Sequence, residues 1–164
     1  MIGGGTGSGK TTLGGALINE TVARSDPNER YVIIEDTPEI QCRAQNLVQL
    51  RTAEAADLTR LVRATIRLRH DRPVIGKVRG AEALGLLKAW ATGHPGGVTT
   101  VHANSAPAVL TRLSSLVQET GVPPQPELIA ATIKLIAFIV RTPTGSRVTE
   151  IVRLEGYDVR EGSS

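Results

Sequence analysis

The segment that most constrains the fold lies at the start of the chain, where residues 4–11 read GGTGSGKT. It fits the pattern G-x-x-x-x-G-K-[ST], in which glycines let the backbone turn tightly and leave successive N–H groups pointing inward. A loop of this kind joins a buried strand to a helix, whose amino end adds further N–H groups. Residues 4–11 therefore predict a strand, a loop and a helix in that order.

The same segment predicts a phosphate-binding site for ATP. We expect Lys10 to reach the β- and γ-phosphates and the Thr11 hydroxyl to ligate a Mg²⁺ ion that bridges them. A glycine-rich turn that binds nothing is the alternative, which is disfavoured because the full pattern opens a good helix. The residues predicted to contact the nucleotide are Gly4, Gly5, Thr6, Gly7, Ser8, Gly9, Lys10, Thr11 and Thr12.

The strand expected before the loop is short. Only Met1, Ile2 and Gly3 precede the motif, against a usual strand length of about five residues. The loop needs a rigid support, because donors misplaced by ~1 Å can cost ~10²-fold in catalysis. We therefore expect the first strand and an N-terminal domain to be missing, so that this chain is an N-terminally shortened piece of a longer protein, which retains nucleotide binding more readily than full turnover.

The composition favours a parallel sheet wrapped in helices. Of the 164 residues, 40% are hydrophobic but only 2% are aromatic, so the core must be aliphatic. An aliphatic core suits such a sheet better than a sandwich or a barrel. The few aromatic side chains also disfavour a base-stacking surface for nucleic acids. The net charge of +3 is compatible with a polyanionic partner or an anionic membrane surface without requiring either.

The sequence also indicates in which cellular compartment the protein works. The single cysteine, Cys42, excludes an internal disulfide and fits a reducing environment. No signal peptide is recognisable, and the apolar stretch 128–140 contains Lys134 and is too short to span a bilayer. These features predict a cytoplasmic protein.

Apolar periodicity predicts strands that alternate with helices. Strands are expected at residues 30–36, 46–51, 72–78 and 96–103, with a closing antiparallel pair at 135–141 and 148–156. Helices are expected at residues 11–24, 58–66, 80–93, 105–120 and 126–134, with Ser105 as an N-cap. This order predicts an α/β domain over residues 1–160, in which a mostly parallel sheet is flanked by helices, followed by a tail at 161–164.

Carboxylates follow the predicted strand at residues 30–36. The stretch VIIEDTPEI places Glu35 and Asp36 at its end and Glu39 just beyond. Ligands of parallel sheets bind beyond the carboxyl ends of the strands. A carboxylate there can orient or deprotonate a water molecule near a γ-phosphate, although surface acids in a turn are the alternative interpretation.

Two later stretches, RLRHDRPVIGKVRGAEAL (67–84) and ATGHPGGVTTVHANSA (91–106), extend the pattern. With the loop and IIEDTPE, they resemble the secretion-ATPase superfamily of type IV secretion, type II secretion and pilus motors. They look most like its conjugal-transfer branch, the TrbB-type ATPases. The resemblance implies a RecA-like P-loop ATPase domain that works in a hexameric ring, with ATP between neighbouring subunits.

The implied function is a motor that powers substrate export or assembly of the mating-pair apparatus. The implied partners are like subunits and inner-membrane components of the secretion system, with peripheral association at the inner membrane. A pilus or type II secretion motor is the neighbouring alternative. A nucleic-acid motor is disfavoured, since no aromatic and basic tract stands out.

The resemblance also implies roles for individual residues. Residues 35–39 match the acidic segment called the Asp box, in which Glu39 would be the general base, assisted by Glu35. Residues 93–102 match the histidine box, in which His102 would sense the γ-phosphate or a conformational change. With Lys10 these are the predicted catalytic residues. A satisfied core histidine is the alternative for His102.

The sequence contains two further histidines. His94 precedes a Pro-Gly turn within the histidine box and is expected to assist there, unless it is simply a turn residue. His70 is expected on the surface without a role, because it stands where relatives often carry proline.

The sequence departs from the family pattern at the Walker B position, VIGKVRG (74–80). Relatives carry Gly-Glu there, whereas this chain has Gly76 and Lys77. A protonated lysine cannot ligate Mg²⁺ and repels it. We therefore expect Lys77 to impair hydrolysis while nucleotide binding is partly retained. A catalytically impaired nucleotide-binding protein is thus an alternative function, unless Lys77 points elsewhere.

An arginine stripe accompanies the predicted helix at residues 58–66. Arg60, Arg63 and Arg67 fall on the face opposite its apolar positions. The stripe is either a solvated face, a set of arginines that reach a neighbour's phosphates or pair with its acids, or a DNA-contact surface. An arginine supplied by a neighbour can raise a phosphoryl-transfer rate ~10³-fold or more.

Overall fold

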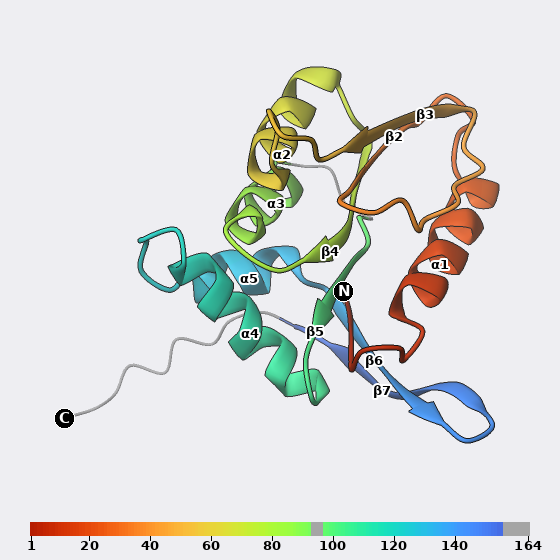
Figure 1. The fold of residues 1–164 in the computed structure, drawn as a ribbon, viewed down its shortest axis with the longest axis vertical. Helices are drawn as coiled ribbons and strands as arrows, with labels where there is room; N and C mark the ends of the chain where they lie inside the picture. The colour runs from red at the N-terminus through yellow and green to blue at the C-terminus, as the bar shows by residue number, and fades with distance from the viewer. Residues whose placement is uncertain (93–96, 156–164) are drawn as a thin grey trace.

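The computed structural model describes residues 1–92 and 97–155 of the chain. Within this part, seven strands form one sheet in the order β3-β2-β4-β5-β1-β6-β7, and Figure 1 shows helices on both of its faces. The strands are β1 (Ile2–Gly4), β2 (Arg30–Glu35), β3 (Asn46–Arg51), β4 (Arg72–Val78), β5 (Thr99–His102), β6 (Leu135–Thr142) and β7 (Gly145–Arg153). The helices are α1 (Lys10–Arg24), α2 (Leu58–Thr65), η1 (Ile66–Leu68), α3 (Glu82–Ala91), α4 (Ala106–Gln118) and α5 (Pro126–Thr132).

The sheet is parallel except for its last pair, β6 and β7, which run antiparallel. The three-residue strand β1 lies near the middle and pairs with β5 on one side and β6 on the other. Its last residue, Gly4, lies opposite His102 and Ile139. The predicted α/β class, with a mostly parallel sheet and an antiparallel C-terminal pair, is confirmed.

The two faces of the sheet have separate apolar cores. On one face, α1 packs through Ile18 against Tyr31 and Ile33 of β2 and Val74 of β4. On the other face, α2, α3, α4 and α5 cover a larger core that contains Phe138 and is otherwise made of aliphatic side chains. The aliphatic core expected from the low aromatic content is therefore present on both faces.

Most predicted element boundaries agree with the structure within two residues, and those at residues 46–51 and 72–78 agree fully. The last strand, predicted at 148–156, is displaced by three residues and is Gly145–Arg153. The strand predicted at 96–103 is shorter, and within the described residues it spans Thr99–His102. At Gly97 a Cβ atom would lie 2.0 Å from Trp90 Nε1 and 2.5 Å from the Pro73 carbonyl oxygen, so the backbone there passes close to the indole. The predicted helix end at Gly93 lies outside the described residues.

The helix α4 begins as predicted. The Ser105 hydroxyl accepts the backbone N–H of Ala108 at 3.2 Å and caps its first turn. The apolar stretch 128–140 is divided between α5 and β6 and does not form one helix. No helix in the described part of the chain is both long enough and apolar enough to cross a membrane.

The expectation that His70 lies on the surface is wrong. Its side chain is only 3% exposed, and its Nδ1 atom lies 2.8 Å from the carbonyl oxygen of Thr65. The neighbouring Arg69 has a φ of 49°, in the left-handed region, which turns the chain back toward the sheet after η1. This turn brings the imidazole under the end of α2.

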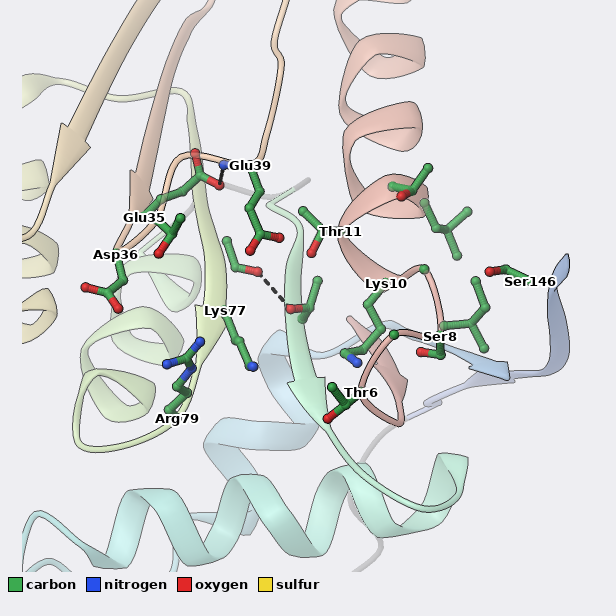
Figure 2. A pocket seen from close by; sticks show the side chains of 18 of the residues that line it. Thr6, Ser8, Lys10, Thr11, Glu35, Asp36, Glu39, Lys77, Arg79 and Ser146 are labelled. Atoms are coloured by element: carbon green, nitrogen blue, oxygen red, sulfur yellow. Dashed lines mark hydrogen bonds between the residues drawn. The ribbon is translucent and has the colours of Figure 1, made fainter. Parts of the chain in front are cut away.

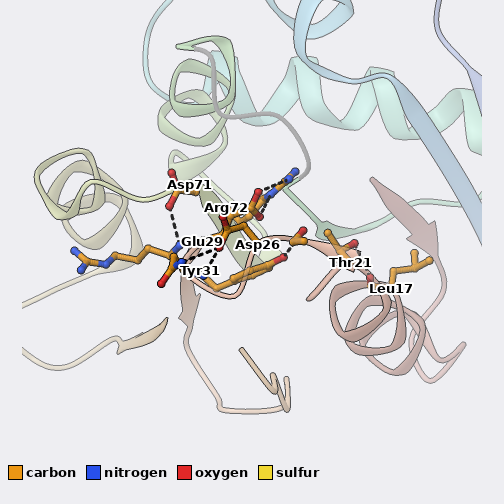
Figure 3. Close-up of polar contacts among 10 residues, drawn as sticks. Leu17, Thr21, Asp26, Glu29, Tyr31, Asp71 and Arg72 are labelled. Atoms are coloured by element: carbon orange, nitrogen blue, oxygen red, sulfur yellow. Dashed lines mark hydrogen bonds and ion pairs between the residues drawn. The ribbon is translucent and has the colours of Figure 1, made fainter. Parts of the chain in front are cut away.

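A polar network joins β2 and β4 at their amino ends, away from the glycine-rich loop (Figure 3). Glu29 and Arg72 form an ion pair at 2.9 Å. The backbone N–H of Arg30 donates to Asp71 Oδ2 at 2.7 Å, and the N–H of Asp71 donates to the Arg30 carbonyl at 3.0 Å. These contacts set the register between the two strands whose carboxyl ends carry the candidate site.

Candidate functional site

A cavity of about 810 Å³ lies at the carboxyl edge of the sheet (Figure 2). Its wall is formed by the glycine-rich loop with the first turns of α1, the segment after β2, the end of β4, and residues of β5, β6 and β7. This is the edge at which parallel sheets bind ligands. The cavity therefore lies where the sequence placed the phosphate-binding site.

The loop between β1 and α1 is shaped by glycines with positive φ, 69° at Gly7 and 91° at Gly9. Gly9 is the N-cap of α1 and leaves its first N–H groups without a side-chain acceptor. Inside the loop, the Gly5 carbonyl accepts hydrogen bonds from Ser8 Oγ, at 2.9 Å, and from Lys10 Nζ. The loop thus holds the Lys10 ammonium group beside the uncapped amino end of a helix, which favours an anion.

Close packing explains two of the loop glycines. A Cβ atom at Gly4 would lie 2.3 Å from the Ile139 carbonyl oxygen and 2.7 Å from Ser8 Oγ. A Cβ atom at Gly9 would lie 2.6 Å from Ser146 Oγ. The hairpin of β6 and β7 therefore packs directly against the loop, and only glycine fits at these two contacts.

Glu35 stands at the end of β2 and is buried, with 6% of its surface exposed. Its Oε1 atom accepts the backbone N–H groups of Glu39 and Ile40, both at 3.0 Å. The side chain also lies against Gly76, where a Cβ atom would come within 2.9 Å of Glu35 Cγ. Glu35 lines the cavity, but these contacts make it a residue that positions the segment after β2.

The other acids of this segment differ in their surroundings. Glu39 is exposed, lines the cavity and projects from the turn that Glu35 holds. Asp36 also lines the cavity, and it accepts a hydrogen bond from the Thr52 hydroxyl. Of the three carboxylates, Glu39 is the best placed to meet a ligand in the cavity.

Lys77 lies at the end of β4, and Figure 2 shows its ammonium group directed into the same cavity as that of Lys10. Burial lowers the pKa of Lys10, and the positive charge of Lys77 lowers it further. The alternative that Lys77 points away from the site is therefore wrong. Arg79, two residues further on, also lines the cavity.

The predicted sensor His102 lies at the end of β5, beside Gly4. It is exposed, so the interpretation as a core histidine is wrong, and it is not among the residues that line the cavity. His94 lies outside the described residues. Of the predicted catalytic residues, the structure brings Lys10, Glu35 and Glu39 together around the cavity.

The arginine stripe lies away from the cavity. Arg60, Arg63 and Arg67 are exposed and do not line the cavity. The guanidinium group of Arg60 donates to the carbonyl oxygen of Ala55 at 2.8 Å. The stripe is therefore available on the outer surface of α2 and η1.

The cavity is also lined by residues that were not singled out from the sequence, among them the polar residues Thr100 of β5, Arg141 of β6 and Ser146 of β7. The Thr100 hydroxyl donates to the Gly76 carbonyl at 2.8 Å and ties β5 to the end of β4. Arg141 follows the apolar run 135–140, whose carboxyl end reaches the same edge because β6 is parallel to β1. Predicting that Arg141 lines the cavity would have required this strand order, which the sequence does not show.

The comparison with protein families decides the affiliation. A family described as "Type II/IV secretion system protein" matches residues 1–155. The chain belongs to this family. Its relatives include a "Probable conjugal transfer protein TrbB" of Sinorhizobium fredii, which is 53% identical over 96% of this chain. A "Type IV secretion system protein VirB11" of Bartonella quintana is 34% identical over 92% of the chain.

Solved structures agree with this membership in the secretion family. The VirB11 ATPase of the Brucella suis type IV secretion system, solved with sulphate, has a TM-score of 0.82 and 26% identity over 93% of this chain. The pilus retraction motor PilT with bound ADP shares the fold, with a TM-score of 0.73 at 22% identity. The chain spans about half of these relatives, 48% of the conjugal transfer protein and 47% of the VirB11 ATPase chain.

Proposed function

We propose that this chain is the ATP-binding and ATP-hydrolysing motor domain of a conjugal transfer system of the type IV secretion class. The observation that carries the proposal is the cavity itself, in which the loop, Lys10 and Glu39 converge at the uncapped amino end of α1. The conjugal transfer relatives support the system, and the sulphate complex of the VirB11 ATPase supports an oxyanion ligand for the family.

The chemistry of the proposed site follows from its residues. Loop N–H groups and the Lys10 ammonium group bind the β- and γ-phosphates of ATP. A water oxygen attacks the γ-phosphorus, the bond to the bridging oxygen breaks, and ADP and phosphate leave. The Glu39 carboxylate accepts the proton of that water, and Glu35 holds the Glu39 backbone in place.

The motor is proposed to act as a homo-oligomeric ring, as the conjugal transfer resemblance implies. The exposed stripe of Arg60, Arg63 and Arg67 is available to a neighbouring subunit. Inner-membrane components of the secretion system are the proposed partners, with the motor at the cytoplasmic face of that membrane and His102 as its sensor. Light scattering of the protein with and without ATP measures ring formation directly.

Mg²⁺, which the family resemblance implies, fits the donors of this cavity poorly. The Thr11 hydroxyl, the predicted ligand, lines the cavity. Of the carboxylates that line the cavity, however, Glu35 already accepts two backbone N–H groups and Asp36 accepts a hydrogen bond from Thr52. Lys77 also places a positive charge beside Lys10. Mg²⁺ is usually held by one or two carboxylates together with substrate phosphates.

Lys77 favours a second function, in which the protein binds nucleotide but hydrolyses little of it. It predicts that the protein binds ATP but releases phosphate slowly, and that Lys77→Glu raises the release rate. No gain in Lys77→Glu would exclude Lys77 as the cause of slow turnover.

Equilibrium dialysis with labelled ATP, followed by a phosphate-release assay, tests the proposed function. We expect Lys10→Ala to weaken ATP binding and Glu39→Gln to retain binding while phosphate release falls by about 10²-fold or more. Lys88→Ala is the matched control, because Lys88 is an exposed lysine of α3 outside the cavity lining. A correctly folded wild-type protein that takes up no ATP would refute the proposal.

A further inference from the structure

The end of β4 is irregular at the position of Lys77. The strand pairs with β5 at Ile75, opposite Thr99, and again at Val78, opposite Val101. Between these pairs β4 has one residue more than β5, which makes a β-bulge at Gly76 and Lys77. Bulges re-aim side chains and are frequent beside active sites.

The bulge is held from several sides. The Thr100 hydroxyl donates to the Gly76 carbonyl at 2.8 Å, and the Glu35 side chain packs against the Gly76 Cα. Beyond the strand, the backbone N–H groups of Arg79 and Gly80 donate to Glu82 Oε1 at 2.6 and 3.0 Å. Lys77 is exposed between the buried residues Gly76 and Val78, so its side chain is directed to the cavity by a fixed backbone.

Positive and negative groups occupy different parts of the cavity wall. The lining includes four basic side chains, namely Lys10 at the start of α1, Lys77 at the end of β4, Arg79 just beyond it and Arg141 of β6. Its acids all come from residues 35–39, after β2. Two of these acids already accept hydrogen bonds, Glu35 from backbone N–H groups and Asp36 from Thr52. Within the described residues no ion pair joins these bases to these acids, so the bases are available to an anionic ligand.

Two ammonium groups in one cavity repel each other: burial lowers the pKa of Lys10, and the charge of Lys77 lowers it further. A polyphosphate bound between the two ammonium groups removes their repulsion, because each ammonium group then contacts an anionic oxygen. In nucleotide sites of this class, a metal ion usually neutralises the phosphate oxygens. Lys77 supplies a positive charge from the protein instead.

We propose that Lys77 is a phosphate-binding residue and that this cavity binds the polyphosphate of a nucleotide without requiring Mg²⁺. The proposal deepens the proposed function and rests on it, since it concerns the same nucleotide in the same cavity. It assigns binding to Lys77 and leaves the hydrolysis rate as a separate question.

Calorimetric titration of the full chain with ATP, once in EDTA and once in excess Mg²⁺, tests the proposal. For the wild type we expect dissociation constants that agree within about threefold, which is less than 1 kcal/mol. We expect Lys77→Met to weaken binding in EDTA by about tenfold, as for the loss of one charge-assisted hydrogen bond. We expect Lys77→Glu to bind ATP at least about tenfold more weakly in EDTA than in Mg²⁺.

Lys88→Met is the matched control and should bind as the wild type does in both buffers, because Lys88 lies outside the cavity lining. Two results would overturn this inference but not the proposed function. One is wild-type binding that weakens about tenfold or more in EDTA, and the other is a Lys77→Met protein that binds as the wild type does. Absence of binding in both buffers would overturn the proposed function as well. Circular dichroism establishes that each variant is folded, and Lys77→Gln replaces any variant that is not.

Discussion

One carboxylate oxygen of Glu35 accepts the backbone N–H of Glu39 at 3.0 Å, so the buried acid holds the exposed one in place. The same oxygen accepts the N–H of Ile40, and Ile40 is buried in the smaller core. Glu35 therefore connects the sheet, the core under α1 and the wall of the cavity. We expect its carboxylate to act on the proposed reaction through the position of Glu39.

Replacement of Glu35 by alanine and by glutamine should separate its role in positioning Glu39 from the role of its negative charge. Glu35→Ala leaves two N–H groups without their acceptor and should lower the free energy of unfolding by about 1–3 kcal/mol. Phosphate release should fall more than ATP affinity does. Glu35→Gln keeps a carbonyl oxygen for both bonds and should preserve more of the stability and the rate, as urea unfolding and release assays measure. Equal losses in both variants would mean that the negative charge itself is required.

Gly76 should not tolerate a side chain. In Gly76→Ala the new Cβ atom would lie 2.9 Å from Glu35 Cγ and 3.0 Å from Glu35 Oε1, so we expect a loss of about 1–3 kcal/mol of stability. Gly15→Ala is the control, since no atom lies within 4 Å of a Cβ at that position in α1. It should stabilise the protein by about 0.5–1 kcal/mol. Thermal unfolding of both variants measures the contrast, and a Gly76→Ala variant as stable as the wild type would contradict the close packing of Glu35 on Gly76.

Gly9 should be required for ATP binding as well as for folding. Gly9→Ala combines a φ of 91° with a Cβ atom 2.6 Å from Ser146 Oγ, so the loop or the hairpin must shift. Gly121→Ala is the matched control, because Gly121 has a φ of 78° with open space around its Cβ position. Both variants carry backbone strain of about 1–2 kcal/mol. Only Gly9→Ala should lose ATP affinity in calorimetry, and normal affinity in this variant would show that the loop tolerates the shift.

The element pattern was predictable because it depends on local periodicity. The strands at residues 46–51 and 72–78 have the predicted boundaries, and the Ser105 cap was visible as a serine directly before an apolar stripe. His70 was mispredicted because its burial depends on the left-handed turn at Arg69. A left-handed arginine has no sequence signature, since only glycine adopts that conformation routinely.

The ion pair between Glu29 and Arg72 should contribute stability that disappears in acid. The hydrogen bond from Arg72 holds the pKa of Glu29 below its usual value, so the contribution is present above the unfolded pKa of about 4.3. It is lost as the pH falls through the folded pKa. Glu29→Gln should be less stable than the wild type by up to about 1 kcal/mol near neutral pH. Urea unfolding should show this difference shrinking at about pH 3, and a difference independent of pH would contradict the assignment.

The composition of the cavity was less predictable than the fold. Lys10, Thr11 and the acids at 35–39 were evident from motifs, because those residues are adjacent in sequence to the elements that place them. Arg141 and Ser146 reach the cavity only because β6 lies beside β1, which is a property of the strand order. The direction of Lys77 depends on a bulge opposite β5, which no local pattern shows.

The most direct test of the central claim, that the glycine-rich loop binds nucleotide phosphates, is an NMR titration of the ¹⁵N-labelled protein with ATP. We expect the largest shifts of backbone N–H signals in residues 5–11, where the loop meets α1, with smaller changes at Lys77 and Glu39. Signals of α4 and α5, which do not line the cavity, should stay nearly unchanged. A saturating titration that leaves the loop signals in place, or shifts only residues outside the cavity, would contradict the claim that the loop binds nucleotide phosphates.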